Sequence, residues 1–217
     1  MAINKRDLIT LIQQTEGFSN PNIKLEQYCI DAKSAVDIVF FAGVEFNDIK
    51  NRLILDLGAG TGRLSIACAY LQASYVLSVD IDFSALKILK KNIRNYGLEA
   101  IIFPICSDIN HFELLRNENP NRFYITTIMN PPFGVQKKTA DRSFLAKAFN
   151  ISHVVYSIHL ANPNVHQFIS TFVKKFNWSI DYVFPYHMKL TKTYQFHKQK
   201  TKSINVNIYR FKRKKES

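Results

Sequence analysis

A glycine-rich turn after a short apolar run constrains the fold of this chain more than any other feature. The segment Leu53–Arg63 reads LILDLGAGTGR, with glycine at positions 58, 60 and 62. Its apolar half predicts a buried strand, and the glycines predict a sharp turn where a ligand can approach the backbone without interference from a Cβ atom. An apolar helical pattern follows at Gly62–Leu71. A strand, a glycine turn and a helix in this order are typical of the nucleotide-binding unit of α/β proteins.

A carboxylate at Asp80 supports a ligand at this turn. It ends the next predicted strand, Tyr75–Asp80, at a spacing where an acid accepts hydrogen bonds from both hydroxyls of a ribose. Arg63 takes the place of the third small residue of a dinucleotide turn, so its side chain opposes the approach of a pyrophosphate. The pattern D-x-G-x-G-x-G at Asp56–Gly62 instead resembles the first motif of the Rossmann-like methyltransferases, whose cofactor carries no phosphate. Asp108, after the third strand, is a weaker candidate for an acid that binds the cofactor's adenine, because aspartate is common in turns.

Strands and helices alternate along most of the chain, which indicates β-α-β units and a mainly parallel sheet. The expected strands are Arg52–Leu57, Tyr75–Asp80, Ala100–Ile105, Tyr124–Met129, His153–Ile158, Trp178–Phe184 and Ile204–Phe211. The expected helices are a short one around Leu8–Ile12, then Ala32–Ala42, Gly62–Leu71, Phe83–Tyr96, Asp141–Phe149 and Asn164–Phe176. The last two strands have no helix between them, so we expect them to be antiparallel in a mixed sheet. We expect one α/β domain over residues 1–217, with a helical extension at 1–50 and a Rossmann-like core at 51–217.

The charge of the chain favours a polyanionic partner. The formal net charge is +12 and the isoelectric point is near 9.6, and nucleic acid is the commonest partner of so basic a protein. From Lys189 to Ser217 there are ten Lys and Arg residues and one acid. Cations can meet phosphates there while aromatic faces stack on unpaired bases; the alternative is a solvated basic connection between two strands. The candidate RNA-binding residues are Lys189, Lys192, Tyr194, Phe196, His197, Lys198, Lys200 and Lys202.

Other features set limits on the class of protein. The three cysteines are far apart and the histidines show no metal-ligand spacing, so we expect neither disulfides nor a metal site. No apolar run approaches the ~20 residues that a membrane span needs. The segment Met1–Leu11 carries charges among its apolar residues, unlike a secretory signal. We therefore expect a soluble, cytoplasmic protein.

A second motif predicts the chemistry. The segment Ile128–Gly134 reads IMNPPFG and follows the fourth strand, beside the position where α/β proteins bind ligands. A conjugated amino group such as adenine N6 must pyramidalise before it can attack a methyl group. Asn130 Oδ1 and the Pro131 carbonyl can accept its two N–H groups, and the prolines fix that geometry. Phe133 offers a flat face to a flipped base. We predict Asn130, Pro131, Pro132 and Phe133 as catalytic residues; Asn-Pro-Pro by itself would be only a turn.

The chain resembles the archaeal and eukaryotic small-subunit ribosomal RNA adenine-N6 methyltransferases along nearly its whole length. The segments that carry the resemblance are Gly17-Phe18, Leu25–Tyr28, Asp56–Gly62, Asp80–Asp82, Asn130–Gly134, Tyr156–His159 and Phe196–Lys198. Leu25–Tyr28 and Phe196–Lys198 are more specific to the family than the glycine motif.

The resemblance implies a seven-stranded class I methyltransferase fold with the last strand antiparallel, and S-adenosylmethionine as cofactor. It implies cofactor contacts from Gln27, Gly58, Asp80 and Asp108. With the neighbouring motif residues, the predicted cofactor-binding set is Gln27, Tyr28, Asp56, Gly58, Gly60, Thr61, Gly62, Asp80, Ile81, Asp108 and Ile109. The family usually has Pro-Thr after the tyrosine, whereas this chain has Cys29-Ile30. Isoleucine cannot supply the threonine's hydroxyl contact.

Related activities remain alternatives. The same catalytic turn serves guanine-N2 methylation of ribosomal RNA and glutamine-amide methylation of release factors. The glutamine enzymes usually have a larger N-terminal domain and tyrosine in place of Phe133. DNA adenine methylation is a weaker alternative, because the sequence shows no added target-recognition domain. An inert RNA-binding scaffold is the alternative from another class, and the intact Asn130 and glycines argue against it.

The third strand predicts a protein partner. The segment Ala100–Ile105 has no charged residue, although edge strands are usually protected by charge or irregularity. Members of the similar family act with a small zinc-binding activator that docks on this edge. We therefore expect a heterodimer in which the activator pairs with Ile101, Ile102 and Phe103; helices that cover both faces, with Pro104 as protection, are the alternative.

Overall fold

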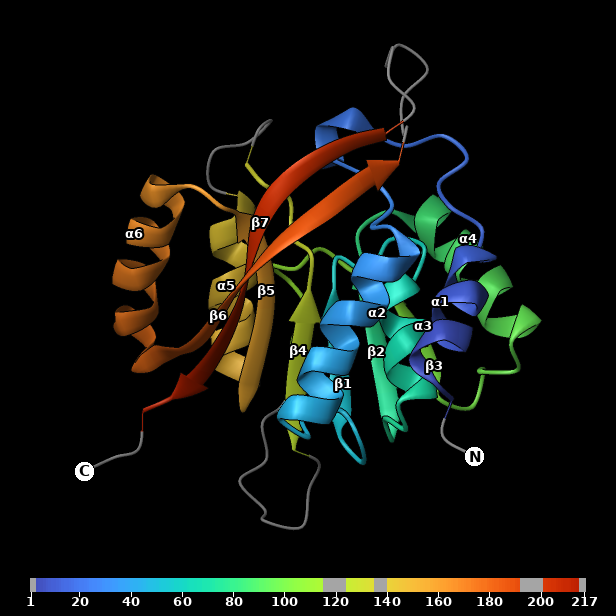
Figure 1. Cartoon of the computed structure of the whole chain (residues 1–217), viewed down its shortest axis with the longest axis horizontal. Coiled ribbons are helices and arrows are strands. Elements are labelled where there is room, and N and C mark those ends of the chain that lie inside the picture. Colours follow the sequence, from blue (N-terminus) through green and yellow to red (C-terminus); the bar gives the residue numbers. More distant parts are fainter. Residues whose placement is uncertain (1–2, 115–123, 135–139, 192–200, 215–217) are drawn as a thin grey trace.

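The computed structural model shows a seven-stranded sheet between two layers of helices (Figure 1). It describes residues 3–114, 124–134, 140–191 and 201–214. The strand order is β3-β2-β1-β4-β5-β7-β6. Strands β1 to β5 are parallel, and β7 is antiparallel to both β5 and β6. The mixed sheet with an antiparallel last strand that the sequence predicts is therefore confirmed.

The elements follow the expected order. The strands are β1 Leu53–Leu57, β2 Tyr75–Asp80, β3 Ile102–Cys106, β4 Ile125–Met129, β5 Val154–Leu160, β6 Trp178–Thr191 and β7 Thr201–Arg213. The α-helices are α1 Lys5–Gln13, α2 Ala32–Phe40, α3 Arg63–Tyr70, α4 Phe83–Asn95, α5 Ala140–Ile151 and α6 Pro163–Phe172. Short helical turns are η1 Ile23–Leu25, the π-helical η2 Phe41–Glu45, and η3 Val173–Phe176. Among these described elements, no helix is both long and apolar enough to cross a bilayer.

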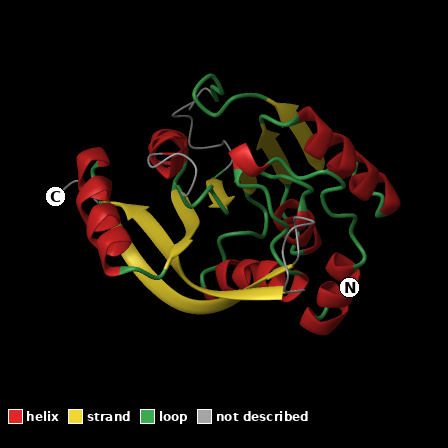
Figure 2. Cartoon of the chain, turned by 90° about the horizontal axis from the view of Figure 1, so that it is seen from above, coloured by secondary structure: helices red, strands yellow, loops and turns green. Residues whose placement is uncertain are grey.

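Each face of the sheet has its own apolar core. Buried residues of α1, α2, α3 and α4 pack on one face, and those of α5, α6 and η3 pack on the other (Figure 2). The central strand β4 is buried along its whole length, because helices cover both of its sides. This arrangement places the carboxyl ends of β1, β2 and β4 together at the upper edge of the sheet in Figure 1, where the glycine turn begins.

The final hairpin is longer than the sequence predicts. Its strands pair from Trp178 with Arg213 to Thr191 with Thr201, so the predicted limits Phe184 and Ile204 were wrong. On β6 the added residues Tyr186–Thr191 do alternate between apolar and polar, and Met188 is buried, so the prediction overlooked a pattern that was present. On β7 the added residues Thr201–Ser203 are all polar and gave no such pattern. The outer half is also held from the side, because Asp31 Oδ2 accepts from the Lys189 amide at 3.2 Å.

A buried ion pair fixes the hairpin to the segment before β1. Arg210 of β7 donates to Asp48 at 2.9 and 2.7 Å, and the Tyr156 hydroxyl of β5 donates to the same carboxylate at 2.7 Å. Asp181, at an irregularity in β6, accepts from Arg210 as well. Arg210 and Asp48 are buried, and such charges are stable only when every one is paired.

Candidate functional site

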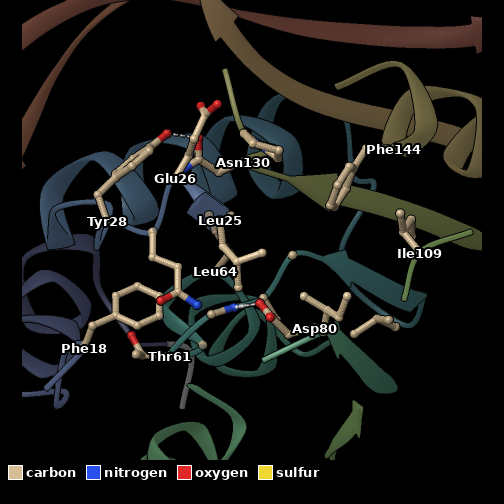
Figure 3. Close-up of a pocket in the computed structure, with 18 of the residues that line it drawn as sticks. Phe18, Leu25, Glu26, Tyr28, Thr61, Leu64, Asp80, Ile109, Asn130 and Phe144 are labelled. Carbon is tan, nitrogen blue, oxygen red and sulfur yellow. Dashed lines mark hydrogen bonds between the residues drawn. The ribbon is translucent and has the colours of Figure 1, made fainter. Parts of the chain in front are cut away.

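A pocket lies at the carboxyl ends of β1, β2, β3 and β4, with the segment before α2 as its opposite wall (Figure 3). Twelve of the predicted cofactor-binding and catalytic residues line it: Gln27, Tyr28, Gly58, Gly60, Thr61, Gly62, Asp80, Ile81, Asp108, Ile109, Asn130 and Pro132. Asp56, Pro131 and Phe133 do not. The fold thus gathers residues from five separate segments of the sequence around one cavity.

The glycine turn follows β1 and forms the floor of the pocket. Gly58, Gly60 and Gly62 all have positive φ angles, a region that residues with a Cβ atom rarely adopt. A Cβ at Gly62 would lie 2.0 Å from Leu89 Cδ1, so this glycine also permits the close packing of α4. The turn leaves the amide of Gly60 directed at the tip of β2, where Asp80 Oδ2 accepts from it at 2.7 Å.

Asp80 is placed to bind a ligand's hydroxyl groups. Its Oδ1 accepts from the Asp82 amide at 2.8 Å and its Oδ2 from Gly60, yet each carboxylate oxygen can accept a further hydrogen bond. Burial raises the pKa of Asp80 above its ordinary value, partly offset by these amide donors. Hydroxyl donors of a ribose would stabilise the charged form further. The residue fits the predicted role.

Part of the pocket lining is suited to a flat ring with an amino group. Ile81, Ile109 and Phe144 contribute apolar side chains to this lining. Asp108 Oδ1 accepts from the amide and the side chain of Asn110 at 2.8 and 2.9 Å. Its Oδ2 has no partner among the described residues, so it can accept from an amino group. Apolar walls and one carboxylate acceptor are the combination that recognises adenine.

The opposite wall is tied to the glycine turn and to the tip of β2. Gln27 donates to Asp82 Oδ2 at 2.7 Å. The Ile30 carbonyl accepts from Arg63 at 2.7 Å, and Arg63 also donates to Thr15 at 3.0 Å. Arg63, which departs from the dinucleotide pattern, therefore fixes the segment before α2 to the start of α3. The Ile30 side chain is buried.

The turn after β4 brings the catalytic candidates to the mouth of the pocket. Asn130 Oδ1 accepts from the Tyr28 hydroxyl at 2.9 Å. The Phe133 ring is half-buried and lies 5.6 Å from the Tyr28 ring, at an interplanar angle of 30°. Pro131 is buried and Pro132 lines the pocket. The amide oxygen is thus held beside the cavity by a defined partner.

The sequence reasoning missed several residues of the site. Phe18 approaches the turn so closely that a Cβ at Gly60 would lie 2.9 Å from its ring. Phe144 of α5 and Leu25 of η1 complete the apolar lining (Figure 3). Phe18 and Leu25 belong to segments that carry the family resemblance, which was a signal for their importance. Phe144 stands in a helix that reads as ordinary amphipathic structure, so nothing local marked it.

Asp56 lies beneath the turn. It is fully buried, and its Oδ2 accepts from Ser65 Oγ at 2.5 Å, with Ser78 bonded to the same hydroxyl at 2.7 Å. Burial, with a smaller contribution from the charge of Asp80, raises its pKa to about 7. Its contacts hold β1 against α3, so it supports the turn.

Among the described residues, none of those predicted to bind RNA or the partner lines the pocket. Lys189 is exposed on β6 and Lys202 belongs to β7; Lys192, Tyr194, Phe196, His197, Lys198 and Lys200 lie outside the described residues. Strand β3 is an edge strand, as expected. Ile101 is half-buried just before it, Ile102 is 2% exposed and Phe103 is 41% exposed. Only Phe103 of the three presents a large side-chain surface to solvent.

Comparisons with known proteins agree with this geometry. Residues 40–152 match the Methyltransferase small domain family. The chain is 32% identical to the rRNA N(6)-adenosine-methyltransferase METTL5 of Danio rerio, over 95% of this chain and 97% of that protein. It is 35% identical to an uncharacterized protein of Methanocaldococcus jannaschii, over 97% and 95%. A crystal structure from Pyrococcus horikoshii superposes with a TM-score of 0.85 at 36% identity, covering 98% of this chain and 99% of that one.

The raised pKa of Asp56 predicts a pH dependence of stability. Because the folded protein keeps a proton that the unfolded chain releases between about pH 4 and pH 7, stability falls as the pH rises through this range. Asp56→Asn cannot titrate, so its free energy of unfolding should fall less between pH 5 and pH 8 than that of the wild type. Urea unfolding at the two pH values measures the difference. Asp7→Asn, an exposed aspartate on α1, is the control and should follow the wild type. If the free energy of unfolding changed equally with pH in Asp56→Asn and in the wild type, the raised pKa of Asp56 would be contradicted.

Proposed function

The chain belongs to the Methyltransferase small domain family and to the family of rRNA N(6)-adenosine-methyltransferases named METTL5, and on this premise we propose that it methylates N6 of an adenosine in small-subunit ribosomal RNA. It is an S-adenosylmethionine-dependent methyltransferase. The observation that carries the proposal is the position of Asn130 Oδ1, held by Tyr28 at the mouth of the pocket that the glycine turn and Asp80 form. A ribosomal RNA substrate also agrees with the cytoplasmic location predicted from the sequence.

The residues of the pocket fit S-adenosylmethionine. We assign the ribose to Asp80, the adenine to Asp108 between Ile81 and Ile109, and the amino-acid part to the region of Gln27 and the glycine turn. The observation that supports this assignment is the acceptor capacity left on Asp80 and on Asp108 Oδ2. When bound there, the cofactor supplies a methyl group on a positively charged sulfur.

The catalytic turn acts on the target nitrogen. The lone pair of adenine N6 is delocalised into the ring, so the nitrogen becomes nucleophilic only as it pyramidalises. Asn130 Oδ1 and the Pro131 carbonyl accept its two N–H groups and strengthen those bonds as the geometry changes. Phe133 stacks on the flipped base and holds it against the turn. After methyl transfer the nitrogen would carry a positive charge and lose one of its two protons to solvent, so no strong base is needed.

The final hairpin contributes an RNA surface. Its outer end is tied by the Lys189 amide to Asp31, which directly follows the pocket residue Ile30. RNA bound at Lys189 would therefore lie near the segment that forms this wall of the pocket. The basic charge of this segment supports the assignment, since phosphates dominate the affinity for nucleic acid.

The edge strand β3 takes the small zinc-binding activator. The strand pairs with β2 along one side, and Phe103 lies exposed with its ring 5.9 Å from that of Tyr75. An exposed apolar surface beside an unpaired strand edge favours addition of a strand from another protein. We propose a heterodimer formed at this edge.

The roles of Asn130 and Asp80 predict opposite kinetic effects. Asn130→Ala should lower kcat by ~10²-fold or more, because its bonds strengthen in the transition state, and should leave the dissociation constant of S-adenosylmethionine nearly unchanged. Asp80→Ala should weaken cofactor binding at least about tenfold, because two charge-assisted hydrogen bonds are lost. Calorimetry measures the dissociation constant of S-adenosylmethionine, and steady-state methylation of ribosomal RNA measures kcat. Near wild-type kcat in Asn130→Ala, or unchanged affinity in Asp80→Ala, would contradict the respective role.

The hairpin assignment predicts a change in salt dependence. Replacing Lys198, Lys200 and Lys202 by alanine should weaken RNA binding and reduce the slope of log K against log salt by about 2, because fewer counterions are released. The matched control replaces three exposed lysines of α4 by alanine and so removes the same charge: Lys87, Lys90 and Lys91. Equal slopes for the two variants would show that only net charge matters.

The partner assignment predicts the effect of one charge on the edge. Phe103→Lys should abolish co-purification of a small zinc-binding protein from the native host, because the lysine opposes strand addition. Ile102 is unsuitable for this test because it is buried. Phe83→Lys, at an exposed phenylalanine of α4, is the control and should retain the partner. Retention by Phe103→Lys would place the interface elsewhere.

A further inference from the structure

The hydrogen bond between Tyr28 and Asn130 joins two segments that are 102 residues apart. Tyr28 lies before α2, and Asn130 follows β4. Figure 3 shows the hydroxyl directed at the amide oxygen, across the mouth of the pocket. The hydroxyl thus donates directly to Asn130 Oδ1, the atom that we assign as an acceptor for the target nitrogen.

The surroundings of Tyr28 keep its hydroxyl a donor. A tyrosine is protonated at neutral pH in any case, and burial, with a smaller contribution from the charge of Glu26, raises the pKa of Tyr28 further above its ordinary value. Its ring lies against Phe133. One side chain therefore contacts both Asn130 and the aromatic residue of the catalytic turn.

Residues of the cofactor site hold Tyr28 in place. On one side, Gln27 donates to Asp82, which follows the tip of β2. On the other side, Cys29 Sγ lies 3.6 Å from Thr61 Oγ1, and the Ile30 carbonyl accepts from Arg63. Thr61 and Arg63 belong to the glycine turn and the start of α3. Both neighbours of Tyr28 are thus anchored to the elements that bind the cofactor.

We infer that Tyr28 is a positioning residue, which fixes the amide of Asn130 for methyl transfer and couples the catalytic turn to the cofactor loop. An amide oxygen has two acceptor sites; the Tyr28 hydroxyl occupies one and leaves the other for the target amino group. Without this donor the Asn130 side chain can rotate, and misplaced catalytic groups lose much of their effect. The inference rests on the proposed function, and it gives the Tyr28 hydroxyl a role separate from cofactor binding.

Tyr28→Phe tests the inference, because it removes the hydroxyl and keeps the ring. We expect kcat for adenosine methylation in ribosomal RNA to fall about tenfold or more, while the dissociation constant of S-adenosylmethionine changes by less than about twofold. The retained affinity shows that the variant is folded. Tyr96→Phe is the matched control: it removes a hydroxyl that donates to the Leu11 carbonyl at 3.1 Å, away from the pocket, and should keep the wild-type kcat.

Two results would overturn the inference while leaving the proposed function intact. One is a Tyr28→Phe enzyme with wild-type kcat. The other is a variant with weakened cofactor binding and unchanged kcat at saturating cofactor, which would make the hydroxyl a cofactor ligand. Absence of methyl transfer to ribosomal RNA by the wild-type protein together with its activator would instead overturn the proposed function, and this inference with it.

Discussion

The hydrogen bond from the Gly60 amide to Asp80 is the contact on which the site depends. It joins the turn after β1 to the tip of β2, and it requires the positive φ angles that the glycines supply. The turn then presents Thr61 and Arg63 to the segment before α2, which closes the pocket from the other side. Asp56, buried beneath the turn, holds β1 against α3 through Ser65. A single glycine turn thus sets the positions of the Asp80 carboxylate, of the opposite wall and, through Tyr28, of the Asn130 amide.

The segment before β1 is an integral part of the site. It supplies one wall of the pocket, while the Asp48 carboxylate at its end pairs with Arg210 of the last strand. The outer half of the final hairpin is in turn held by Asp31. These contacts connect the surface assigned to RNA with the pocket assigned to the cofactor, so that one N-terminal segment relates the two.

The sequence predicts the parts of the site that are local. The glycine turn and the turn Asn130–Phe133 are short motifs whose backbone geometry follows from their own residues, and both lie where expected. The sequence pattern does not predict contacts between distant segments, such as those of Tyr28 with Asn130 and of Arg63 with Ile30. Apolar alternation also failed at β3, because Ile102 and Phe103 are both apolar and only the packed sheet decides which is buried. Asp56 was predicted to contact the cofactor because it belongs to the glycine motif. Its side chain is instead buried against Ser65 of α3 and does not line the pocket.

Methylation of adenosine N6 can be tested by mass analysis of the nucleosides in cognate small-subunit ribosomal RNA, after incubation with the protein, its activator and isotope-labelled S-adenosylmethionine. We expect label in N6-methyladenosine, and in RNA incubated with Asn130→Ala no more than a residual ~1% of it. Label in N2-methylguanosine, or no label in the RNA when the activator is present, would contradict the proposed activity.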